Sequence, residues 1–383
     1  MEIHMAVTPM LSSNPNTVKL WEQQTLLEMI KTTHAGRMML RGTIMRPDDL
    51  MRSKRGDETT ISYTTILTGI GQGEGGTLVG NEESLNNEAF TMVWNVFRHA
   101  VSSPNDDTIE QRRTYIDFYK TAKKALNQFH MSRLDASVFN QLGGVYSTTI
   151  TVDTTTYSGS NRAFVTGLNT VNAPSTNRII RAGGAATDQA LTSSNTFTLD
   201  LLDAAQEKMA LTYPTAEPLL AMEYDCYISP EQFTDLKRDT SGKVQWYANA
   251  LAMTTSGSNI LETASANLYQ PVGKYANVNI IVAIRVPFGQ DGSTSAAIPT
   301  VRRAIFAGKN ALAFGSAFTG DLKDIQKSGD EGNVPLKYFD ELKDFSYIKA
   351  LEARMIYGAK KIQFDSEDFG SLVISTYAAP HTS

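Results

Sequence analysis

The chain has 383 residues, 41% hydrophobic and 20% charged, a balance that excludes a disordered or fibrous protein. Its 35 basic and 40 acidic residues give a net charge of -5, which excludes a strongly basic body that holds nucleic acid mainly through phosphates. A single cysteine, Cys226, excludes an internal disulfide framework and any zinc site built on several cysteines. We expect a soluble protein of two to three domains, or one large domain with insertions, folded in a reducing cytoplasm.

The sequence predicts no targeting or membrane segment. Residues 1–14 lack a basic region followed by an apolar core, so they do not have the pattern of a signal peptide. The most apolar run, 278–286, is about half the roughly 20 residues needed to cross a bilayer. Because this run is rich in β-branched residues, it predicts a buried strand instead.

The first hundred residues predict an arm and a projecting hairpin. Residues 1–20 are polar and predict an extended arm, and the apolar positions that follow permit a helix to about Lys31. Hydrophobic residues then alternate over 59–67 and 90–96, which predicts two strands joined by the glycine-rich stretch 69–87. The tip of this hairpin has few apolar side chains with which to form a core. It therefore needs another surface to lie on, which indicates a partner.

A long helix is predicted over about 106–142. Hydrophobic residues recur at spacings of three and four, and Gly143-Gly144 provides the stop signal. The Thr/Ser-rich stretch 147–197 predicts a β-rich insertion or a loop. Two further helices are predicted, one over 199–211 and one that begins at the capping box of Ser229, Pro230 and Gln232. Strands are predicted after them, at 278–286, 302–306, 311–314 and 347–364. The fold class is therefore α+β.

Motif analysis finds no catalytic constellation. Residues 71–76 satisfy G-x-G-x-x-G, but no helical pattern follows them, so a flexible loop is favoured over a cofactor loop. The five histidines have no metal-binding spacing, and Cys226 is interpreted as a buried, inert thiol. We therefore predict no catalytic residue, no metal and no cofactor. The acid pairs are candidates for calcium or acid–base chemistry but are more often caps and turns: Asp106/Asp107, Asp324/Asp330 and Asp365/Asp368.

An arm and a hairpin that cannot be stable alone suit a protein that assembles with copies of itself. Short basic clusters, such as 52–55 and 112–113, suit acidic partner surfaces or weak contact with a nucleic-acid backbone. We predict that the contacts between subunits are made by residues of the arm, the basic cluster and the hairpin tip: Trp21, Arg52, Lys54, Arg55, Gly69, Gly71, Gly73, Glu74, Gly75, Gly76, Glu82 and Glu83.

An ordered set of short segments resembles the major capsid proteins of tailed bacteriophages, in particular the coliphage N-four-like group. Each piece alone is weak, but they follow one another along nearly the whole chain. They are Lys19-Leu20-Trp21-Glu22, Gly56-Asp57-Glu58-Thr59-Thr60-Ile61, Gly80-Asn81-Glu82-Glu83, Arg98-His99-Ala100-Val101, Ile228-Ser229-Pro230-Glu231-Gln232, Tyr338-Phe339-Asp340-Glu341 and Gly358-Ala359-Lys360-Lys361.

The resemblance implies the Hong Kong 97-type capsid fold and a division of the chain into named parts. These are an N-terminal arm (1–50), an extended β-hairpin loop (51–102), a peripheral domain with a spine helix (103–146), the Thr/Ser-rich insertion (147–197), an axial domain (198–335) and a C-terminal strand returning to the peripheral domain (336–383).

The function implied is that of a major capsid protein, not an enzyme. Hexamers and pentamers of the chain would form an icosahedral shell around double-stranded DNA without sequence-specific binding. The implied partners are further copies of the chain, with portal and scaffolding functions during assembly and room for a decoration protein. The implied locations are the virion and, during synthesis, the host bacterial cytoplasm. Two alternatives stay open: another virion protein of the tail or decoration class, and a metal-assisted enzyme with scattered acidic residues.

Overall fold

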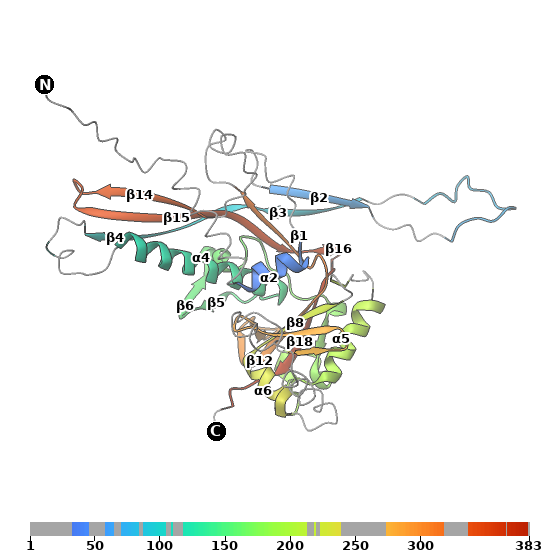
Figure 1. Cartoon of the computed structure of the whole chain (residues 1–383). Helices are drawn as coiled ribbons and strands as arrows, with labels where there is room; N and C mark the ends of the chain where they lie inside the picture. The colour runs from blue at the N-terminus through green and yellow to red at the C-terminus, as the bar shows by residue number, and fades with distance from the viewer. Residues whose placement is uncertain are drawn as a thin grey trace, which may run out of the picture.

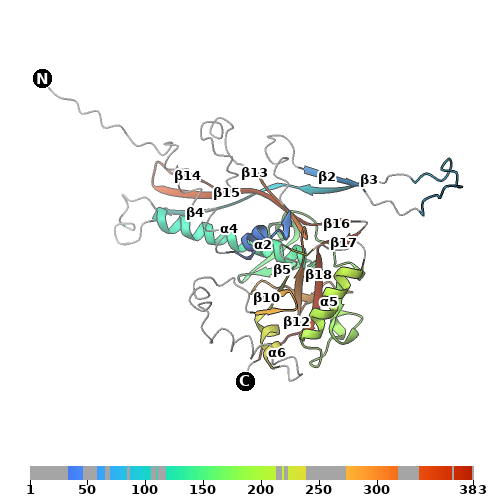
Figure 2. The same ribbon diagram turned by 45° about the vertical axis from the view of Figure 1, so that its right-hand side comes forward.

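The computed structural model describes residues 33–45, 58–64, 70–83, 87–104, 109, 118–212, 218–219, 223–238, 273–317, 336–364 and 366–381. Two sheets form the body of the molecule, and a thin hairpin projects from one end of the upper sheet (Figure 1). The hairpin projects away from both sheets in the turned view as well (Figure 2). The architecture is α+β, as the sequence pattern predicts.

The upper sheet is built around one long strand, β15 (Ile348–Lys361). Ala353, Met355 and Tyr357 are buried and alternate with less buried residues, which confirms the predicted period of two. Four more strands complete this sheet: β4 (Asn95–Pro104), β14 (Lys337–Lys343) and β13 (Leu312–Ala317) pair with β15 in antiparallel orientation, and β1 (Ile44–Met45) pairs with β13 in parallel.

The lower sheet has seven strands and two hydrophobic faces. One face packs on α5 (Leu199–Leu211) and contributes to the same core as Leu236 of α6 (Pro230–Arg238), while the other contributes Tyr227, Ile281 and Ile305 to the main core. Its strands are β7 (Ile179–Arg181), β18 (Ser371–Tyr377), β12 (Ala297–Ala307), β8 (Tyr224–Ile228), β10 (Val278–Val282) and β9 (Gly273–Tyr275) in that order, with β11 (Phe288–Gln290) also paired to β12.

The spine of the upper sheet is α4 (Phe118–Leu142), which runs along one face of the ribbon formed by β4, β15 and β14 (Figure 1). Ala122 and Leu126 of the predicted stripe are buried in the main core. The helix ends at the predicted glycines. Gly144 has a φ of +60°, and a Cβ atom there would lie 2.5 Å from the Cδ atom of Pro174, so only glycine suits this position.

Residues 33–45 are the described part of the range 1–50 that is expected to form an arm. They form α2 (His34–Arg41) and β1, and α2 buries one face against the main core. The Asp135 carboxylate of α4 accepts a hydrogen bond from the Ala35 backbone N–H at 2.8 Å, so a neighbouring helix caps the start of α2. This part of the chain therefore belongs to the body. The helix predicted over 21–31 lies outside the described residues.

The predicted capping box is confirmed at the start of α6. The Ser229 Oγ atom accepts a hydrogen bond from the Gln232 N–H at 3.2 Å, and the Gln232 side chain accepts one from the Ser229 N–H at 2.9 Å. The insertion predicted at 147–197 is mostly irregular. Its elements are the small hairpin β5 (Thr149–Val152) and β6 (Thr155–Ser158), β7, and four short 3₁₀ helices at Gly159–Val165, Thr176–Arg178, Ala182–Gly184 and Asp188–Ala190.

The C-terminal range 336–383 is divided between the two sheets. Strands β14 and β15 lie in the upper sheet, and β18 lies in the lower sheet beside β12. A short hairpin, β16 (Gln363–Phe364) and β17 (Glu367–Asp368), makes the crossing. There the buried Lys361 ammonium pairs with the Asp368 carboxylate at 2.8 Å, so Asp368 serves an ion pair and not the calcium site considered from sequence.

A second buried ion pair ties the lower sheet to the end of the spine. The Arg303 guanidinium of β12 contacts the Asp188 carboxylate at 2.8 Å, and both side chains are at most 2% exposed. It also donates hydrogen bonds to the carbonyls of Gly143 and Gly144 at 3.2 and 3.1 Å. Burial alone would raise the pKa of Asp188, but the charge of Arg303 and a hydrogen bond from Arg181 outweigh burial and lower it.

We expect Arg303→Met to destabilise the subunit by about 3–5 kcal/mol, because it leaves a buried carboxylate without its main partner. Urea unfolding of the unassembled subunit measures the effect. The matched control is Arg354→Met, which removes a partly exposed ion pair with Glu352 and should lower the free energy of unfolding by less than about 1 kcal/mol. Equal losses in the two variants would contradict the role given to Arg303.

A second prediction concerns the buried His130 and the dependence of stability on pH. Burial first, and then the charges of His99 and Arg133, lower the pKa of His130 to about 3. The unfolded chain takes up this proton below about pH 6.5 and the folded chain does not, so stability falls as the pH drops from 6.5 toward 3. At pH 5 this loss is about 2 kcal/mol. In the variant His130→Gln, the glutamine amide can still donate to the Ala353 carbonyl. We expect the free energy of unfolding of this variant, measured with urea, to fall by about 2 kcal/mol less between pH 7 and pH 5 than that of the wild type. Parallel pH profiles of the two proteins would refute the argument.

Candidate assembly surfaces

The hairpin projects because its root is fixed and its tip is exposed. Strands β2 (Glu58–Thr64) and β3 (Asn87–Val93) pair in antiparallel register, as predicted. Every described residue of the tip, 70–83, is exposed, including Ile70, Leu78 and Val79. Backbone hydrogen bonds inside the tip close local turns, at Gly73–Gly76 and Leu78–Asn81. The tip therefore has a shape of its own but buries nothing within the subunit.

Three contacts hold the root of the hairpin on the body. The Asn169 side chain accepts a hydrogen bond from the Val93 N–H and donates one to the Val93 carbonyl, both at 2.9 Å. The Lys360 ammonium donates to the Thr91 carbonyl at 2.6 Å. A Cβ atom at Gly358 would lie 2.5 Å from the Val93 carbonyl oxygen, so the strand crossing needs glycine there. The direction of the hairpin is thus set by β15 and the insertion.

The predicted alternation along 90–96 changes face at Trp94. Phe90 and Met92 are buried, as expected, but Val96 is exposed and Phe97 is buried in its place. Strand β3 ends at Val93 and β4 begins at Asn95, so two strands with opposite inward faces replace the single strand expected from sequence. This break directs the chain from the hairpin into the upper sheet.

The tip carries charge of one sign. Residues 70–83 include Glu74, Glu82 and Glu83 and no lysine or arginine. The Glu82 carboxylate accepts a hydrogen bond from the Gly80 N–H at 2.7 Å, inside the second turn. The like charges of two such tips repel each other, which disfavours a contact between one tip and another.

The opposite end of the upper sheet presents a second exposed feature. The turn that joins β14 to β15 lies at the far end of the ribbon from the hairpin tip (Figures 1 and 2). It exposes three large apolar side chains, Leu342, Phe345 and Tyr347. Sequence analysis missed this turn, although an aromatic residue between Asp344 and Ser346 was a usable signal for an exposed apolar loop.

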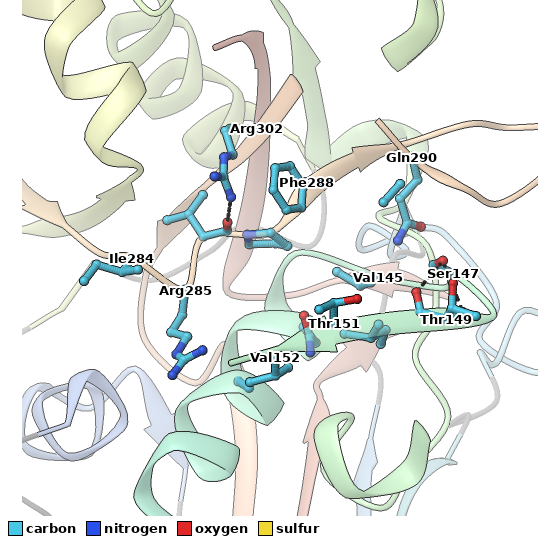
Figure 3. A pocket seen from close by; sticks show the side chains of 16 residues that line it. Val145, Ser147, Thr149, Thr151, Val152, Ile284, Arg285, Phe288, Gln290 and Arg302 are labelled. Carbon is cyan, nitrogen blue, oxygen red and sulfur yellow. Dashed lines mark hydrogen bonds between the residues drawn. The ribbon is translucent and has the colours of Figure 1, made fainter. Parts of the chain in front are cut away.

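A groove of about 240 Å³ lies between the β5–β6 hairpin and the segment that leads from β10 to β11 (Figure 3). Its lining combines apolar residues such as Val152 and Val286 with the hydroxyls of Thr149 and Thr151. Its two guanidinium groups are already paired: Arg302 contacts Glu231 at 3.0 Å and Arg285 contacts Asp153 at 2.6 Å. The groove is smaller than the usual 300–1,000 Å³ of small-molecule sites and offers no charge to a ligand.

Asp153 follows Val152, the last lining residue of β5, at the turn of the β5–β6 hairpin. At the β5–β6 turn its carboxylate contacts Arg285 of the lower sheet's loop and Arg133 of α4, the latter at 2.7 Å, and accepts a hydrogen bond from Ser132. Burial is the largest single effect and raises the pKa of Asp153, but the hydrogen bonds from Ser132, Arg285 and Arg133 together outweigh it and lower the pKa to about 2. The cluster fastens the small hairpin across the joint between α4 and the lower sheet.

Among the described residues, the titratable groups with the largest pKa shifts lie in packed cores. Burial raises the pKa of the Cys226 thiol well above its usual range, and burial together with the charge of Arg37 lowers the pKa of His34 to about 4. Both groups are therefore uncharged and packed in hydrophobic cores. Within the described residues, no group of three or more His, Cys, Asp and Glu side chains has a metal-binding arrangement. None of the described helices is long and apolar enough to cross a membrane.

The predicted contact residues divide into two sets. The structure places Gly71, Gly73, Glu74, Gly75, Gly76, Glu82 and Glu83 together on the exposed tip. The others lie outside the described residues: Trp21, Arg52, Lys54, Arg55 and Gly69. That the tip contacts another subunit stays a prediction.

A profile of the family described as "Phage capsid protein" matches residues 10–380. The chain belongs to this family. It is a structural subunit of a bacteriophage shell and a component of the virion, not an enzyme, which removes the metal-assisted enzyme considered from sequence. A comparison with curated protein sequences finds no match.

Solved structures support the fold of this capsid protein. The capsid of Ralstonia phage GP4 is similar with a TM-score of 0.69 and 21% identity, over 92% of this chain and 93% of that chain. The capsid subunit of Cyanophage Pam1 has a TM-score of 0.62 and 19% identity over 88% of both chains. The head of Helicobacter pylori bacteriophage KHP40 has a TM-score of 0.54 and 11% identity, over 84% and 85%. These likenesses confirm the capsid fold expected from the resemblance, the Hong Kong 97-type.

One prediction tests the cluster that Asp153 forms with Arg133, Arg285 and Ser132. We expect Asp153→Asn to lower the free energy of unfolding by at most about 1 kcal/mol, because the carboxylate is half exposed. Amide exchange should quicken in residues 149–158, which lose their tie to Arg285, and stay unchanged in β12. Glu231→Gln is the matched control, since it removes the ion pair on the other side of the groove. Faster exchange of 149–158 in both variants would show that the effect is not local.

Proposed function

We propose that this capsid protein is the major capsid protein of a double-stranded DNA phage. In this proposal, hexamers and pentamers of the chain build an icosahedral shell, and portal and scaffolding functions guide assembly in the host bacterial cytoplasm. A decoration protein is a further partner for the outer surface, and the coliphage N-four-like group is the expected relationship. The observation that carries the proposal is the hairpin, which is anchored at its root and buries nothing at its tip.

The tip is the part of the subunit that gains most from a neighbour. Its apolar residues Leu78 and Val79 are exposed, and their burial would contribute up to about 1.5–3 kcal/mol each. Its carboxylates favour a receiving surface with positive charge. Lys124, exposed on α4, belongs to the stretch 118–134, which contains no carboxylate. We therefore propose that the tip of one copy lies on a different, more basic part of the next copy.

The proposed shell encloses DNA without binding it tightly. With a net charge of -5 the subunit lacks the positive excess that strong phosphate binding requires. Strength in such a shell comes from many modest contacts made at once. In this proposal the lower sheet is the core of the axial domain, and the upper sheet is the core of the peripheral domain.

Replacing the tip tests the proposal. We expect a variant in which Asn-Gly replaces residues 70–83 to fold with an unchanged urea midpoint, because the tip packs on nothing in the subunit. It should fail to form closed shells under conditions in which the wild-type chain assembles. Negative-stain microscopy distinguishes the outcomes. Shells from the variant would refute the role of the tip, and tubes or free trimers from the wild type would favour a tail or decoration protein.

A further inference from the structure

The side chain of Asn169 takes the place of a strand partner at the root of the β2–β3 hairpin. Val93, the last residue of β3, directs both its backbone N–H and its carbonyl at this side chain. The Asn169 Oδ1 atom accepts from the N–H and the Nδ2 atom donates to the carbonyl, each at 2.9 Å. A carboxamide presents an acceptor and a donor side by side, as a peptide group does in a sheet. Asn169 therefore adds one rung of hydrogen bonding at the end of β3.

The loop that carries Asn169 has an unfavourable backbone just before it. The φ values of Gly167 and Leu168 are +72° and +62°. A Cβ atom at Gly167 would lie 2.6 Å from the carbonyl oxygen of Ala359, so glycine is needed for the loop to approach β15 so closely. Leucine is disfavoured in the left-handed region. Strain of this kind is kept where the surroundings enforce it and concentrates at functional positions, which directs attention to the residue that follows.

Two elements of the body hold this loop in place. The Gly167 carbonyl accepts a hydrogen bond from the Ala359 N–H of β15 at 2.8 Å. In the last turn of α4, the buried Gln141 side chain donates to the carbonyls of Thr166 and Asn169 at 2.5 and 3.3 Å. The end of the spine helix and the long strand of the upper sheet thus fix the position from which the Asn169 side chain reaches Val93.

The chain can bend where the hairpin joins the upper sheet. Strand β3 ends at Val93 and β4 begins at Asn95, so Trp94 belongs to neither strand and the buried face changes there. The hairpin also packs apolar side chains on the body, but apolar packing is non-directional. Hydrogen bonds depend on angle, so the paired contact of Asn169 with Val93 restrains direction directly beside the break.

We propose that Asn169 is a positioning residue that fixes the angle at which the β2–β3 hairpin leaves the upper sheet, and that this angle sets the curvature of the shell. The second part rests on the proposed function, in which the tip of one copy lies on the next copy. The angle between hairpin and body then fixes the angle between neighbouring subunits. A closed shell of one size requires that angle to be narrowly defined.

Spin labels measure the angle in the unassembled subunit, without any assumption about shells. Ala89→Cys on β3 and Ala125→Cys on α4 provide two exposed attachment points, and the buried Cys226 stays unlabelled. We expect Asn169→Ala to broaden the distribution of distances between the two labels. The Val93 N–H should exchange about tenfold faster, because it loses its hydrogen bond. The urea midpoint should stay close to that of the wild type, since Asn169 is only half-buried.

Two further variants separate hydrogen bonding from other effects. Asn172→Ala is the matched control, because Asn172 is exposed on the same segment and contacts Gln363 instead of the hairpin. It should leave the distance distribution unchanged. Asn169→Asp keeps the size and the acceptor but cannot, as a carboxylate, donate to the Val93 carbonyl, so it should broaden the distribution as well. An unchanged distribution in Asn169→Ala, or equal broadening in Asn172→Ala, overturns the inference.

Assembly tests the link to curvature. Under conditions in which the wild-type chain forms shells of one size, we expect Asn169→Ala to give shells of several sizes, seen by sedimentation and negative-stain microscopy. Uniform shells of wild-type size from this variant overturn the link. If the wild-type chain forms no shells at all, the proposed function fails, while the label distances still decide whether Asn169 sets the angle. The two failures are therefore distinguishable.

Discussion

The orientation of the two sheets depends on the buried contact between Arg303 and Asp188. A buried guanidinium is tolerated only when its donors are paired, and here they reach Asp188 and the last carbonyls after α4 at the same time. Because β12 lies inside the lower sheet and α4 packs on the upper one, this arginine links the two layers beside the hydrophobic core that both share. Lys361 and Asp368 repeat the arrangement where the chain crosses between the sheets.

A fixed body gives the projecting parts a fixed direction. The hairpin root is held by Asn169 and Lys360, which set the direction in which β3 leaves the body. A preoriented limb loses less conformational entropy on binding than a free one, which matters when each contact in a shell is weak. The β14–β15 turn extends from the other end of the same sheet, so one rigid element positions both surfaces (Figure 1).

The hairpin tip and the β14–β15 turn differ in charge. The tip carries only carboxylates, which suits a contact between unlike surfaces. The β14–β15 turn carries both signs, and its Lys343 pairs with Glu341. The acidic balance of the whole chain is compatible with an enclosed genome that is not held to the wall.

Local rules in the sequence determined the elements whose stabilising partners lie nearby in the chain. The end of α4 at Gly143-Gly144, the Ser229–Gln232 capping box, the stripe of α5 and the β2–β3 hairpin are of this kind. Only the tertiary structure decided the change of face at Trp94, the cap that Asp135 gives to α2, the division of 336–383 between two sheets and the exposure of Phe345. Each of these depends on residues far apart in the sequence, whose contacts no local period encodes. The order of the short motifs along the chain was enough to indicate the family. Which surfaces are exposed for contacts between subunits followed only from the tertiary structure.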